Sequence, residues 1–429
     1  MRSLDQWLQW QESLHISAID LGLERIRRVA ERLNLLKPPF PIITVAGTNG
    51  KGSTVALLTS ILVAAGYRVG TYTSPHLLRY NERVALNAEP VSDEQLCAAF
   101  SAIEVVRGDI SLTYFEFSTL AALWIFHQHV VDVAVLEVGL GGRLDATNTW
   151  DAHVAIVTGI DLDHVDWLGD NRESIAYEKA SIARKGQPLI CGDTNPPQRI
   201  ATTAQTIGAV LWQNTKDFSV ISQPEIKRFS VMCAAATSLG HHFQDLPYPN
   251  LQGEFQLTNA ACALMALDQL YEVLPQVTRA AIEQGLQSVA LTGRLQKLQS
   301  QPDVWVDVAH NPQAARVLAD WLEGQPQLGK TYVIFSLLAD KNLVAVVEAL
   351  RTVVDEWHVF KVESPRATPL ETLVSTIQDQ GISAIIAHNS LTQAWRAVQS
   401  SLNAQDRVVI FGSFLVVSGA LDALFKVSR

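Results

Sequence analysis

The sequence predicts an α/β protein of two domains, because short β-branched runs alternate with longer amphipathic runs in two separate series. Strands that alternate with helices imply mostly parallel sheets that helices cover on both faces. The chain has 429 residues, which is too long for one ordinary core. A polar, turn-rich stretch at 291–303 separates the two series, and we place the hinge there. The predicted domains are residues 1–291 and residues 296–429, of which the second is the smaller.

The first series has the pattern of a large parallel sheet. "FPIITVAG" at 40–47 predicts a buried strand, and "KGSTVALLTSILVAAG" predicts a helix that ends at Gly66. "SDEQ" at 92–95 fits a capping box that opens another helix. Further strands are predicted at 67–74, 131–139 and 151–159.

The last third of the chain restarts the same alternation. "DVWVDVA" at 303–309 predicts a strand, and the helix after it has Asn311 as its N-cap and Pro312 as its first residue. The remaining strands are predicted at 331–338, 356–362, 383–388 and 406–413, with helices from about 341, after Pro369 and at 391–401. The pattern predicts a five-stranded α/β domain of roughly 130 residues, an ordinary domain size.

Composition excludes several classes of protein. The net charge is −10 and no run of Lys or Arg stands out, so neither nucleic acid nor an anionic membrane is expected as a partner. The four cysteines are scattered without a C-x-x-C pair, which argues against a disulfide framework and a structural zinc site. The first residues lack the pattern of a signal peptide, and the longest apolar runs are about half of a membrane span. These features predict a cytoplasmic protein.

The stretch "VAGTNGKGST" at 45–54 has the features of a phosphate-binding loop. A strand ends in glycine, a glycine-rich turn follows, and Lys51 with two hydroxyl residues opens a helix. Free backbone N–H groups and the positive helix end attract an anion, and the lysine adds a full charge. The commonest such loop has Ser or Thr directly after its lysine, whereas Gly52 intervenes here. The alternative is an ordinary strand-to-helix turn; the full set of residues favours a nucleoside triphosphate.

Two acidic stretches follow predicted strands. In "LEVGLGGRLDATN" (136–148), Glu137 ends an apolar run, and ligands of parallel sheets collect at the carboxyl ends of strands. We expect Glu137 to hold Mg²⁺ near the phosphates, the alternative being an acid satisfied at a strand end. In "GIDLDHVDWLG" (159–169), three acids surround His164, for which we expect metal or phosphate contact. The same acids compete with His164 for that role.

Other polar residues are less specific. Lys179 lies in a predicted helix, "YEKASIARKG", and its spacing alone indicates a solvated lysine. "DVAHNP" at 307–312 places Asp307 and His310 where a strand gives way to a helix, so they line the binding edge of the second domain. Arg294, in the hinge, is a further candidate for phosphate contact.

These segments, in this order, resemble one family. The stretches are "AGTNGKGST", "TSPHLLRYNERV", "LTYFEFSTLAAL", "LEVGLGGRLDATN", "DHVDWLG", "EKASIARKG", "TGRLQ", "DVAHNP" and "FGSF". They are similar to the folylpolyglutamate synthases, which belong with the Mur ligases, and "AIDLGLERI" resembles the bifunctional dihydrofolate synthase/folylpolyglutamate synthase form. The resemblance runs from about residue 14 to "FGSF" and explains the unusual loop spelling. It implies a P-loop ATPase-like first domain with a pterin site and a Rossmann-like glutamate ligase domain.

The resemblance also implies roles for individual residues. The ATP contacts would be Thr48, Asn49, Gly50, Lys51, Gly52, Ser53, Asn259, Arg294 and Asp307. The ligands of two Mg²⁺ ions would be Ser74, Glu137 and His164, with Lys179 carboxylated by CO₂ in support, which differs from the solvated interpretation above. The dihydropteroate contacts would be Ala18, Ile19, Asp20, Leu21, Thr113, Leu144, Asp145 and Ala146, and the glutamate contacts His310 and Ser413.

The implied reaction joins L-glutamate to dihydropteroate or to a reduced folate at the expense of ATP. The acceptor carboxylate becomes an acyl phosphate, which the glutamate amine then attacks. Family resemblance also implies a monomer. Three alternatives remain open: a ligase that accepts only folates, a nucleotide-dependent folate-binding protein without ligase activity, and a cell-wall Mur ligase.

Overall fold

The computed structural model describes residues 2–17, 19–235, 237–326 and 329–425. The chain forms two compact units. Unit 1 comprises Met1–His76, Tyr80–Asn250 and Gln256–Ala290, and unit 2 comprises Leu77–Arg79, Leu251–Phe255 and Leu291–Arg429. Both units are α/β, so the predicted fold class is confirmed.

Unit 1 contains an eight-stranded sheet in the order β4-β3-β2-β5-β1-β6-β7-β8. Neighbouring strands from β2 to β8 are parallel, and only β3 and β4 at one edge pair antiparallel. The strands are β1 Ile42–Ala46, β2 Val69–Tyr72, β3 Val84–Leu86, β4 Glu89–Pro90, β5 Val133–Glu137, β6 Val154–Val157, β7 Pro188–Cys191 and β8 Val210–Gln213.

The order of the central strands positions the candidate site. β1 lies between β5 and β6, with Val45 opposite Glu137 and Ala46 opposite Val157. All residues of the three strands are buried, as expected for apolar strands covered on both faces. Because parallel strands end at one edge, the loops that follow β1, β5 and β6 meet there.

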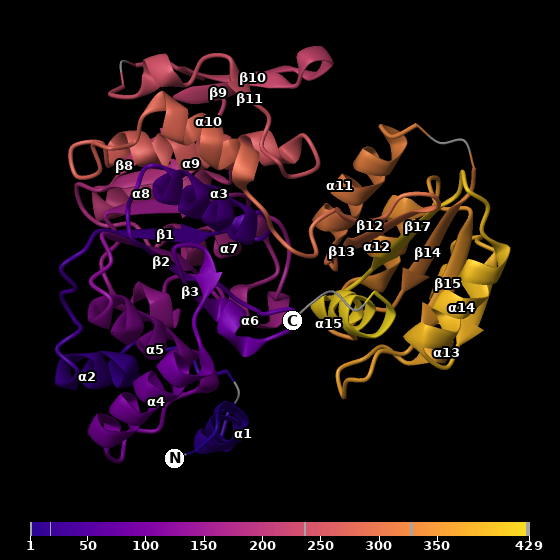
Figure 1. Cartoon of the computed structure of the whole chain (residues 1–429), viewed down its shortest axis with the longest axis horizontal. Coiled ribbons are helices and arrows are strands. Elements are labelled where there is room, and N and C mark those ends of the chain that lie inside the picture. Colours follow the sequence, from indigo (N-terminus) through magenta and orange to yellow (C-terminus); the bar gives the residue numbers. More distant parts are fainter. Residues whose placement is uncertain (1, 18, 236, 327–328, 426–429) are drawn as a thin grey trace. The chain divides into compact units, whose positions relative to one another are not determined.

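Helices cover both faces of this sheet, with α3, α9 and α10 on one face and α2, α4 and α5 on the other (Figure 1). Ser92 and Gln95 form the predicted capping box at the start of α4. The helices are α1 Leu4–Leu14, α2 Glu24–Arg32, α3 Lys51–Ala64, α4 Asp93–Arg107, α5 Tyr114–Gln128, α6 Val165–Leu168, α7 Arg172–Ala180, α8 Gln198–Ile207, α9 Phe255–Gln269 and α10 Arg279–Ser288. A core cluster that includes Trp7, Ile26, Phe100 and Phe117 joins α1, α2, α4 and α5.

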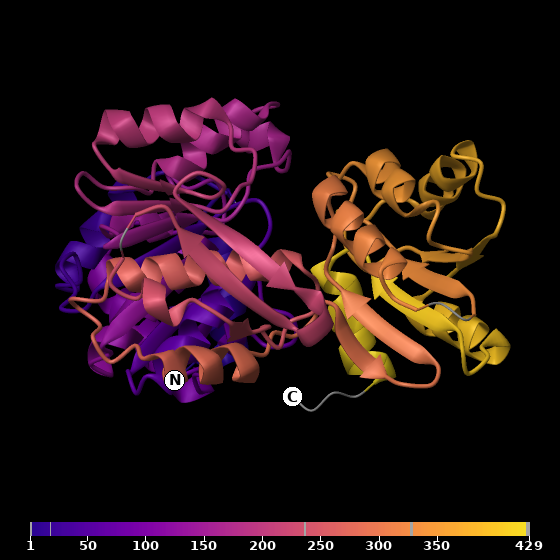
Figure 2. The same ribbon diagram turned by 90° about the horizontal axis from the view of Figure 1, so that it is seen from above.

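A second sheet in unit 1 was not predicted. It has three antiparallel strands, β9 Phe218–Gln223, β10 Arg228–Cys233 and β11 Leu246–Pro247, and forms an outer layer beside α10 (Figure 2). The carboxylate of Asp268, on α9, accepts a hydrogen bond from the backbone N–H of Leu239 at 2.6 Å, which ties the layer to the helices.

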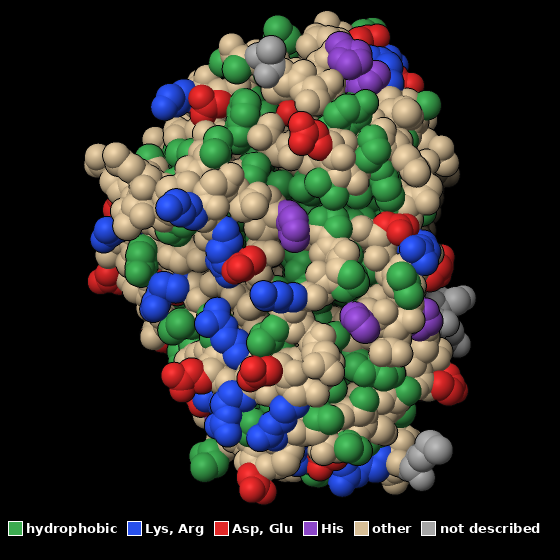
Figure 3. Space-filling model, turned by 90° about the vertical axis from the view of Figure 1, so that its left-hand side faces the viewer, with side chains coloured by type: hydrophobic (Ala, Val, Ile, Leu, Met, Phe, Trp, Pro, Cys, Tyr) green, Lys and Arg blue, Asp and Glu red, His purple; other side chains and the backbone are tan. Residues whose placement is uncertain are grey.

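Basic side chains gather locally on unit 1 although the whole chain is acidic. Figure 3 shows Lys and Arg side chains over the lower half of the face on which α2 lies. On α2 itself, Arg27, Arg28 and Arg32 are exposed. Within the residues that the structure describes, none of the helices has the length and hydrophobicity that crossing a bilayer requires.

Unit 2 is built on a six-stranded sheet in the order β12-β13-β17-β14-β15-β16, one strand more than predicted. The additional strand, β12 Gln296–Gln299, pairs antiparallel with β13 and lies in the stretch expected to be an irregular hinge. The prediction of a turn-rich hinge across 291–303 was therefore wrong for these residues. The other strands are β13 Asp303–Asp307, β14 Thr331–Phe335, β15 Glu356–Phe360, β16 Ile385–His388 and β17 Arg407–Phe411, all in parallel pairs.

The helices after Asn311, near 341, after Pro369 and at 391–401 begin where the sequence predicts, whereas the helix Phe414–Gly419 was not predicted. Asn311 caps α11 by accepting a hydrogen bond from the N–H of Ala314, and Pro312 is its first residue. The helices are α11 Pro312–Glu323, α12 Leu343–Leu350, α13 Leu370–Asp379, α14 Leu391–Ser401 and α15 Phe414–Gly419. Two apolar clusters lie on the two faces of the sheet, and Leu77 and Leu78 pack against the one that contains Val304 and Val417.

Candidate active site

The loop between β1 and α3 requires glycine at two positions. Gly47 has φ +151° and Gly50 has φ +86°, a region that side-chain-bearing residues rarely adopt. A Cβ on Gly47 would lie 1.9 Å from Oγ1 of Thr158, so β6 closes on the loop at this point. The first turn of α3 starts directly after Gly50, and its N–H groups have no acceptors within the helix. The loop therefore has the geometry of an anion-binding helix start.

Lys51, the first residue of α3, folds back over the loop. Its Nζ donates to the carbonyl oxygens of Gly47 at 3.0 Å and Thr48 at 3.2 Å. Thr48 joins the loop to the segment after β6, because its Oγ1 donates to the carbonyl of Asp161 and accepts from the same residue's N–H, both at 3.0 Å. A lysine held at this place adds a full positive charge to the helix start.

Glu137 ends β5 beside the first turn of α3. It is buried, and its Oε2 accepts a hydrogen bond from the N–H of Ser74 at 3.3 Å. A Cβ on Gly52 would lie 3.8 Å and 4.0 Å from the two carboxylate oxygens, so the glycine leaves open the space between helix and carboxylate. Glu137 and Ser74, two of the expected Mg²⁺ ligands, are thus brought together.

This donor set fits Mg²⁺. Within the described residues, no three His, Cys, Asp or Glu side chains form a metal cage by themselves. Mg²⁺ does not need such a cage, since it binds one or two carboxylates, keeps several waters and takes further oxygens from nucleotide phosphates. The carboxylate of Glu137 beside the start of α3 provides the protein part of such a site.

Asn259, a predicted ATP contact on α9, lies beside the loop. A Cβ on Gly50 would approach Oδ1 of Asn259 to 2.6 Å. Its Nδ2 donates to Oε1 of Gln256 at 2.8 Å, so the amide is held by its own helix. Ser53, in contrast, is buried in the first turn of α3.

Lys179 is buried, so the interpretation of a solvated lysine from spacing alone was wrong. On α7, Ile175, Ala176 and Ala180 are also buried, and Lys179 shares their face at helical spacing. That periodicity was the sequence signal for its burial. Burial and the Lys51 ammonium lower the pKa of Lys179 to about 7, although Asp163 raises it. The amine is therefore close enough to Lys51 to be influenced by its charge, and about half of it is neutral at pH 7.

His164 lies after β6 as expected, and precedes the short helix α6. Its backbone has φ +51°, and its side chain is 40% exposed. Its Nε2 lies 3.9 Å from Oδ2 of Asp163, so one of the competing acids is its neighbour. Of the acids around His164, Asp161 contacts the phosphate loop through Thr48, and Asp163 contacts His164 itself.

Asp145, a predicted substrate contact, is satisfied by its own loop. Its Oδ2 accepts from the N–H groups of Gly139 at 3.1 Å and Leu140 at 2.9 Å, and its Oδ1 accepts from the hydroxyl of Thr147 at 2.7 Å. Burial raises its pKa, which these hydrogen bonds oppose. Leu144 and Ala146 flank it, so the side chain fixes the shape of the loop after β5.

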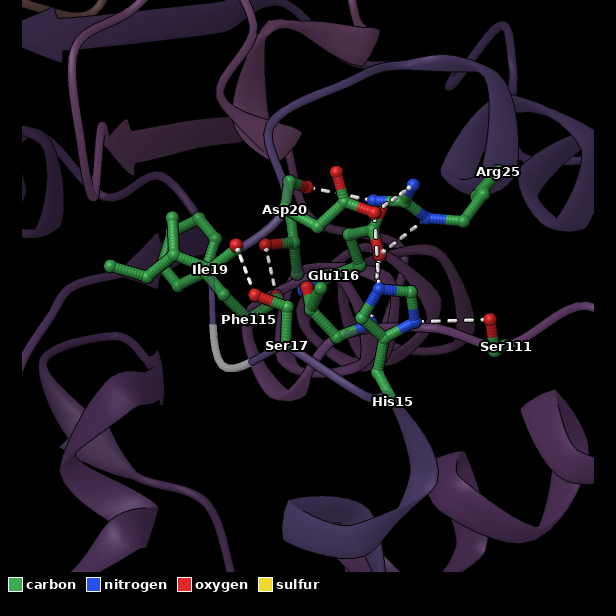
Figure 4. Close-up of polar contacts among 10 residues, drawn as sticks. His15, Ser17, Ile19, Asp20, Arg25, Ser111, Phe115 and Glu116 are labelled. Carbon is green, nitrogen blue, oxygen red and sulfur yellow. Dashed lines mark hydrogen bonds and ion pairs between the residues drawn. The ribbon is translucent and has the colours of Figure 1, made fainter. Parts of the chain in front are cut away.

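The other predicted pteroate residues lie on two segments of unit 1 that contact each other (Figure 4). Asp20 accepts from Nη1 of Arg25 at 2.6 Å and lies 3.0 Å from Nε2 of His15. Arg25 also pairs with Glu116 at 3.3 Å, which joins this segment to the start of α5. Thr113 caps α5 in a capping box with Glu116. Ile19 and Leu21 flank Asp20, whereas Ala18 lies outside the described residues.

In unit 2, the predicted residues gather at the ends of two neighbouring strands. Asp307 ends β13 and accepts from the N–H groups of Leu295 at 2.8 Å and Ala309 at 2.7 Å; burial raises its pKa, which Arg294 opposes. Ser413 follows β17, which pairs with β13, and caps α15. The guanidinium of Arg294 lies 5.5 Å from the ring of Phe414, whose centroid is 6.2 Å from that of His310.

Two residues that shape the loop were not predicted. The hydroxyl of Thr158 donates to the carbonyl of Asn49 at 2.6 Å, and Gln256 holds Asn259. Thr158 follows a predicted strand, so its place at a strand end was the available signal. Gln256 is in a helix of unremarkable sequence and offered no such signal.

Two families match the chain. The Mur ligase middle domain matches residues 45–267, and the glutamate ligase domain of the Mur ligases matches residues 293–414. The first match covers more than half of the chain and includes the loop, Glu137 and Lys179.

Similar proteins cover nearly the whole length. The dihydrofolate synthase/folylpolyglutamate synthase of Escherichia coli K12 is 43% identical over 421 residues, which are 98% of this chain and 95% of the relative. A structure of Escherichia coli FolC in complex with DHPP and ADP has a TM-score of 0.91 at 42% identity, covering 99% of this chain and 98% of the other. A bifunctional folylpolyglutamate synthase/dihydrofolate synthase with Mn, AMPPNP and L-glutamate bound has a TM-score of 0.89 at 43% identity, with the same coverage. The chain therefore belongs to the Mur ligase family and, within it, to the dihydrofolate synthase/folylpolyglutamate synthases.

Proposed function

We propose that the chain is an ATP-dependent ligase that adds L-glutamate to 7,8-dihydropteroate, giving dihydrofolate, and adds further glutamates to folates. The observation that carries this proposal is the 43% identity, over 98% of the chain, to a relative named for both activities. The phosphate loop, with Glu137 beside it, supplies the chemical basis.

ATP binds at the start of α3 in this proposal. The loop Thr48–Ser53 surrounds the phosphates with N–H groups, and the ammonium of Lys51 turns from the loop carbonyls toward them. Asn259, Arg294 and Asp307 are the proposed contacts to the rest of the nucleotide. The resulting positive potential favours the charge that develops as the γ-phosphoryl group moves to the acceptor carboxylate.

The pteroate acceptor occupies the region of Asp20, Thr113 and Asp145 in this proposal. These residues are held by their own contacts, so the pocket is shaped before substrate arrives. The carboxylate of the acceptor attacks the γ-phosphorus of ATP. The bond between this phosphorus and the β-γ bridging oxygen breaks, and an acyl phosphate and ADP form. The glutamate amine then attacks the acyl carbon and phosphate leaves.

Ser74, Glu137 and His164 would hold Mg²⁺. A bound ion would neutralise the negative charge that develops during phosphoryl transfer. Lys179 supports this site as a carbamate: its neutral amine attacks CO₂, a C–N bond forms and one proton leaves to solvent. A pKa near 7 favours this step because an ammonium has no lone pair to donate.

Residues 1–291 bind ATP and pterin in this proposal, and residues 296–429 bind glutamate. His310 is a candidate to accept the proton of the glutamate ammonium. Its Nδ1 lies 2.8 Å from the carbonyl of Val308 and donates to it, so Nε2 is the acceptor nitrogen of the neutral ring. Ser413 would contact the glutamate. We expect a cytoplasmic monomer, and the four free thiols agree with a reducing compartment.

The direct test is ATP-dependent phosphate release with Mg²⁺ and L-glutamate, comparing dihydropteroate with tetrahydrofolate as acceptor. Release with both acceptors supports the proposal. Release with tetrahydrofolate alone identifies the alternative, a synthase that acts only on folates. Release with neither refutes both.

A further inference from the structure

Arg83 is a buried cation enclosed by rings. It ends the 3-10 helix Tyr80–Arg83 of unit 1 and is 9% exposed. Its Nε donates to Nδ1 of His76 at 2.9 Å, and its Cζ lies 5.5 Å from the ring centroids of Tyr80 and Tyr114. Because Nδ1 of His76 accepts this hydrogen bond, it carries no proton. The imidazole is therefore neutral and does not balance the charge of Arg83. The groups in direct contact with the guanidinium, His76, Tyr80 and Tyr114, are therefore neutral.

The fold supplies no carboxylate for this arginine. Among the residues that the structure describes, no Asp or Glu oxygen lies within 4.0 Å of the Arg83 guanidinium, and its two terminal NH₂ groups have no acceptor. Arg25 and Arg107 are also largely removed from solvent, but each of them forms an ion pair with a glutamate. Neither terminal nitrogen of Arg83 is among the fully buried, unsatisfied side-chain atoms of the described residues, so both stay open to water or to a ligand. Arg83 thus has the character of a residue whose counter-charge arrives with a ligand.

Arg83 lies between two parts of the candidate site. Its carbonyl oxygen accepts from the N–H of Thr73 at 2.9 Å, and the next residue, Ser74, donates to Glu137. On the other side it faces Tyr114, which directly follows Thr113 of the proposed pteroate pocket. The arginine is therefore placed along the path from the pteroate to the carboxylate that is activated.

We propose that Arg83 binds the α-carboxylate of a folate acceptor, the carboxylate that is not activated. This inference rests on the proposed function. Dihydropteroate has a single carboxylate, which becomes the acyl phosphate, whereas a folate ends in a glutamate whose γ-carboxylate reacts and whose α-carboxylate remains. The two terminal NH₂ groups of a guanidinium match a carboxylate in a bidentate pair. Arg83 is then a specificity residue for chain extension and contributes little to the first glutamate addition.

The test compares both acceptors with Arg83→Met and Arg83→Lys. For Arg83→Met we expect the KM for tetrahydrofolate to rise about 10- to 100-fold, the loss typical of one charged hydrogen-bonded pair, while the KM for dihydropteroate stays within about twofold. Arg83→Lys keeps the positive charge but cannot form the bidentate pair, so its KM for tetrahydrofolate should lie between those of the wild type and Arg83→Met. Arg107→Met is the matched control, because Arg107 also lies over an aromatic ring, Trp10, but pairs with Glu104. It should leave the ratio of the two KM values unchanged.

A substrate change tests the same contact without a variant protein. The wild-type enzyme should bind a tetrahydrofolate α-amide about 10- to 100-fold more weakly than tetrahydrofolate, and Arg83→Met should bind both equally weakly. Equal loss with both acceptors, a raised KM for glutamate instead, or full wild-type activity on the α-amide would each overturn the proposal. The α-amide result decides the question even if Arg83→Met does not fold. Wild-type activity on neither acceptor would instead refute the proposed function.

Discussion

Replacement of Lys179 by methionine should stabilise the protein at neutral pH. In the folded state the pKa of Lys179 is lowered from 10.5 to about 7, chiefly by burial. At 1.36 kcal/mol per pKa unit, this shift corresponds to a penalty of about 5 kcal/mol. The penalty is fully present below pH 7, where the unfolded chain and the folded chain both bind the proton, and is lost as pH rises toward 10.5. Lys179→Met removes the charge and the penalty while keeping a side chain of similar length.

The assay is urea unfolding of both proteins between pH 6 and pH 10 in CO₂-free buffer. Because all other groups titrate alike, the difference in free energy of unfolding isolates Lys179, and it should shrink by roughly 3–4 kcal/mol between pH 7 and pH 10. The comparison applies to the transition of unit 1, since two units need not unfold together. Bicarbonate should stabilise the wild type alone, through carbamate formation. A difference that stays constant with pH would refute the burial of a titrating amine.

Three further predictions concern the loop and its metal. Lys51→Met should lower kcat about 10²- to 10³-fold, as measured by phosphate release, and retained turnover would exclude its role in charge neutralisation. Gly50→Ala should destabilise the protein by about 1–3 kcal/mol and raise the KM for ATP, because φ is +86° and its Cβ would meet Asn259 at 2.6 Å; Gly22→Ala, with open space around it, is the control and should change neither. Glu137→Gln should raise the Mg²⁺ concentration for half-maximal rate about tenfold or more, and removal of Mg²⁺ by a chelator should abolish wild-type turnover; an unchanged Mg²⁺ dependence would contradict its role as a ligand.

The sequence predicted the parts of the fold that depend on local patterns. Apolar runs such as 40–47, separated by helices, predict buried strands in a parallel sheet, and the strand within this run does pair in parallel with both of its neighbours. The helix starts at Ser92 and Asn311 were predicted because a cap depends on a few neighbouring residues. The edge of the sheet at which the loop, Glu137 and His164 lie follows from the same rule of parallel strands.

The parts that were missed depend on distant partners. β12 has the polar sequence "QKLQ" and is a strand because it pairs with β13, which no local pattern reports. The small sheet of β9, β10 and β11 likewise depends on distant residues, because it packs beside α9 and α10. Spacing alone gave no role to Arg83, because the absence of a counter-charge is a property of the packed structure.

The membership of Leu77 and Leu78 in unit 2 has a consequence for synthesis of the protein. Both side chains pack in the cluster around Val304 and Val417, although they leave the ribosome with the first strands of unit 1. Roughly 225 further residues must be translated before Val304 emerges, which takes about 10–45 s at about 5–20 residues per second. During that interval two leucines of a nascent chain have no core to enter. Their packing therefore has to wait for the last third of the chain, whereas the strands on either side of them can already pair.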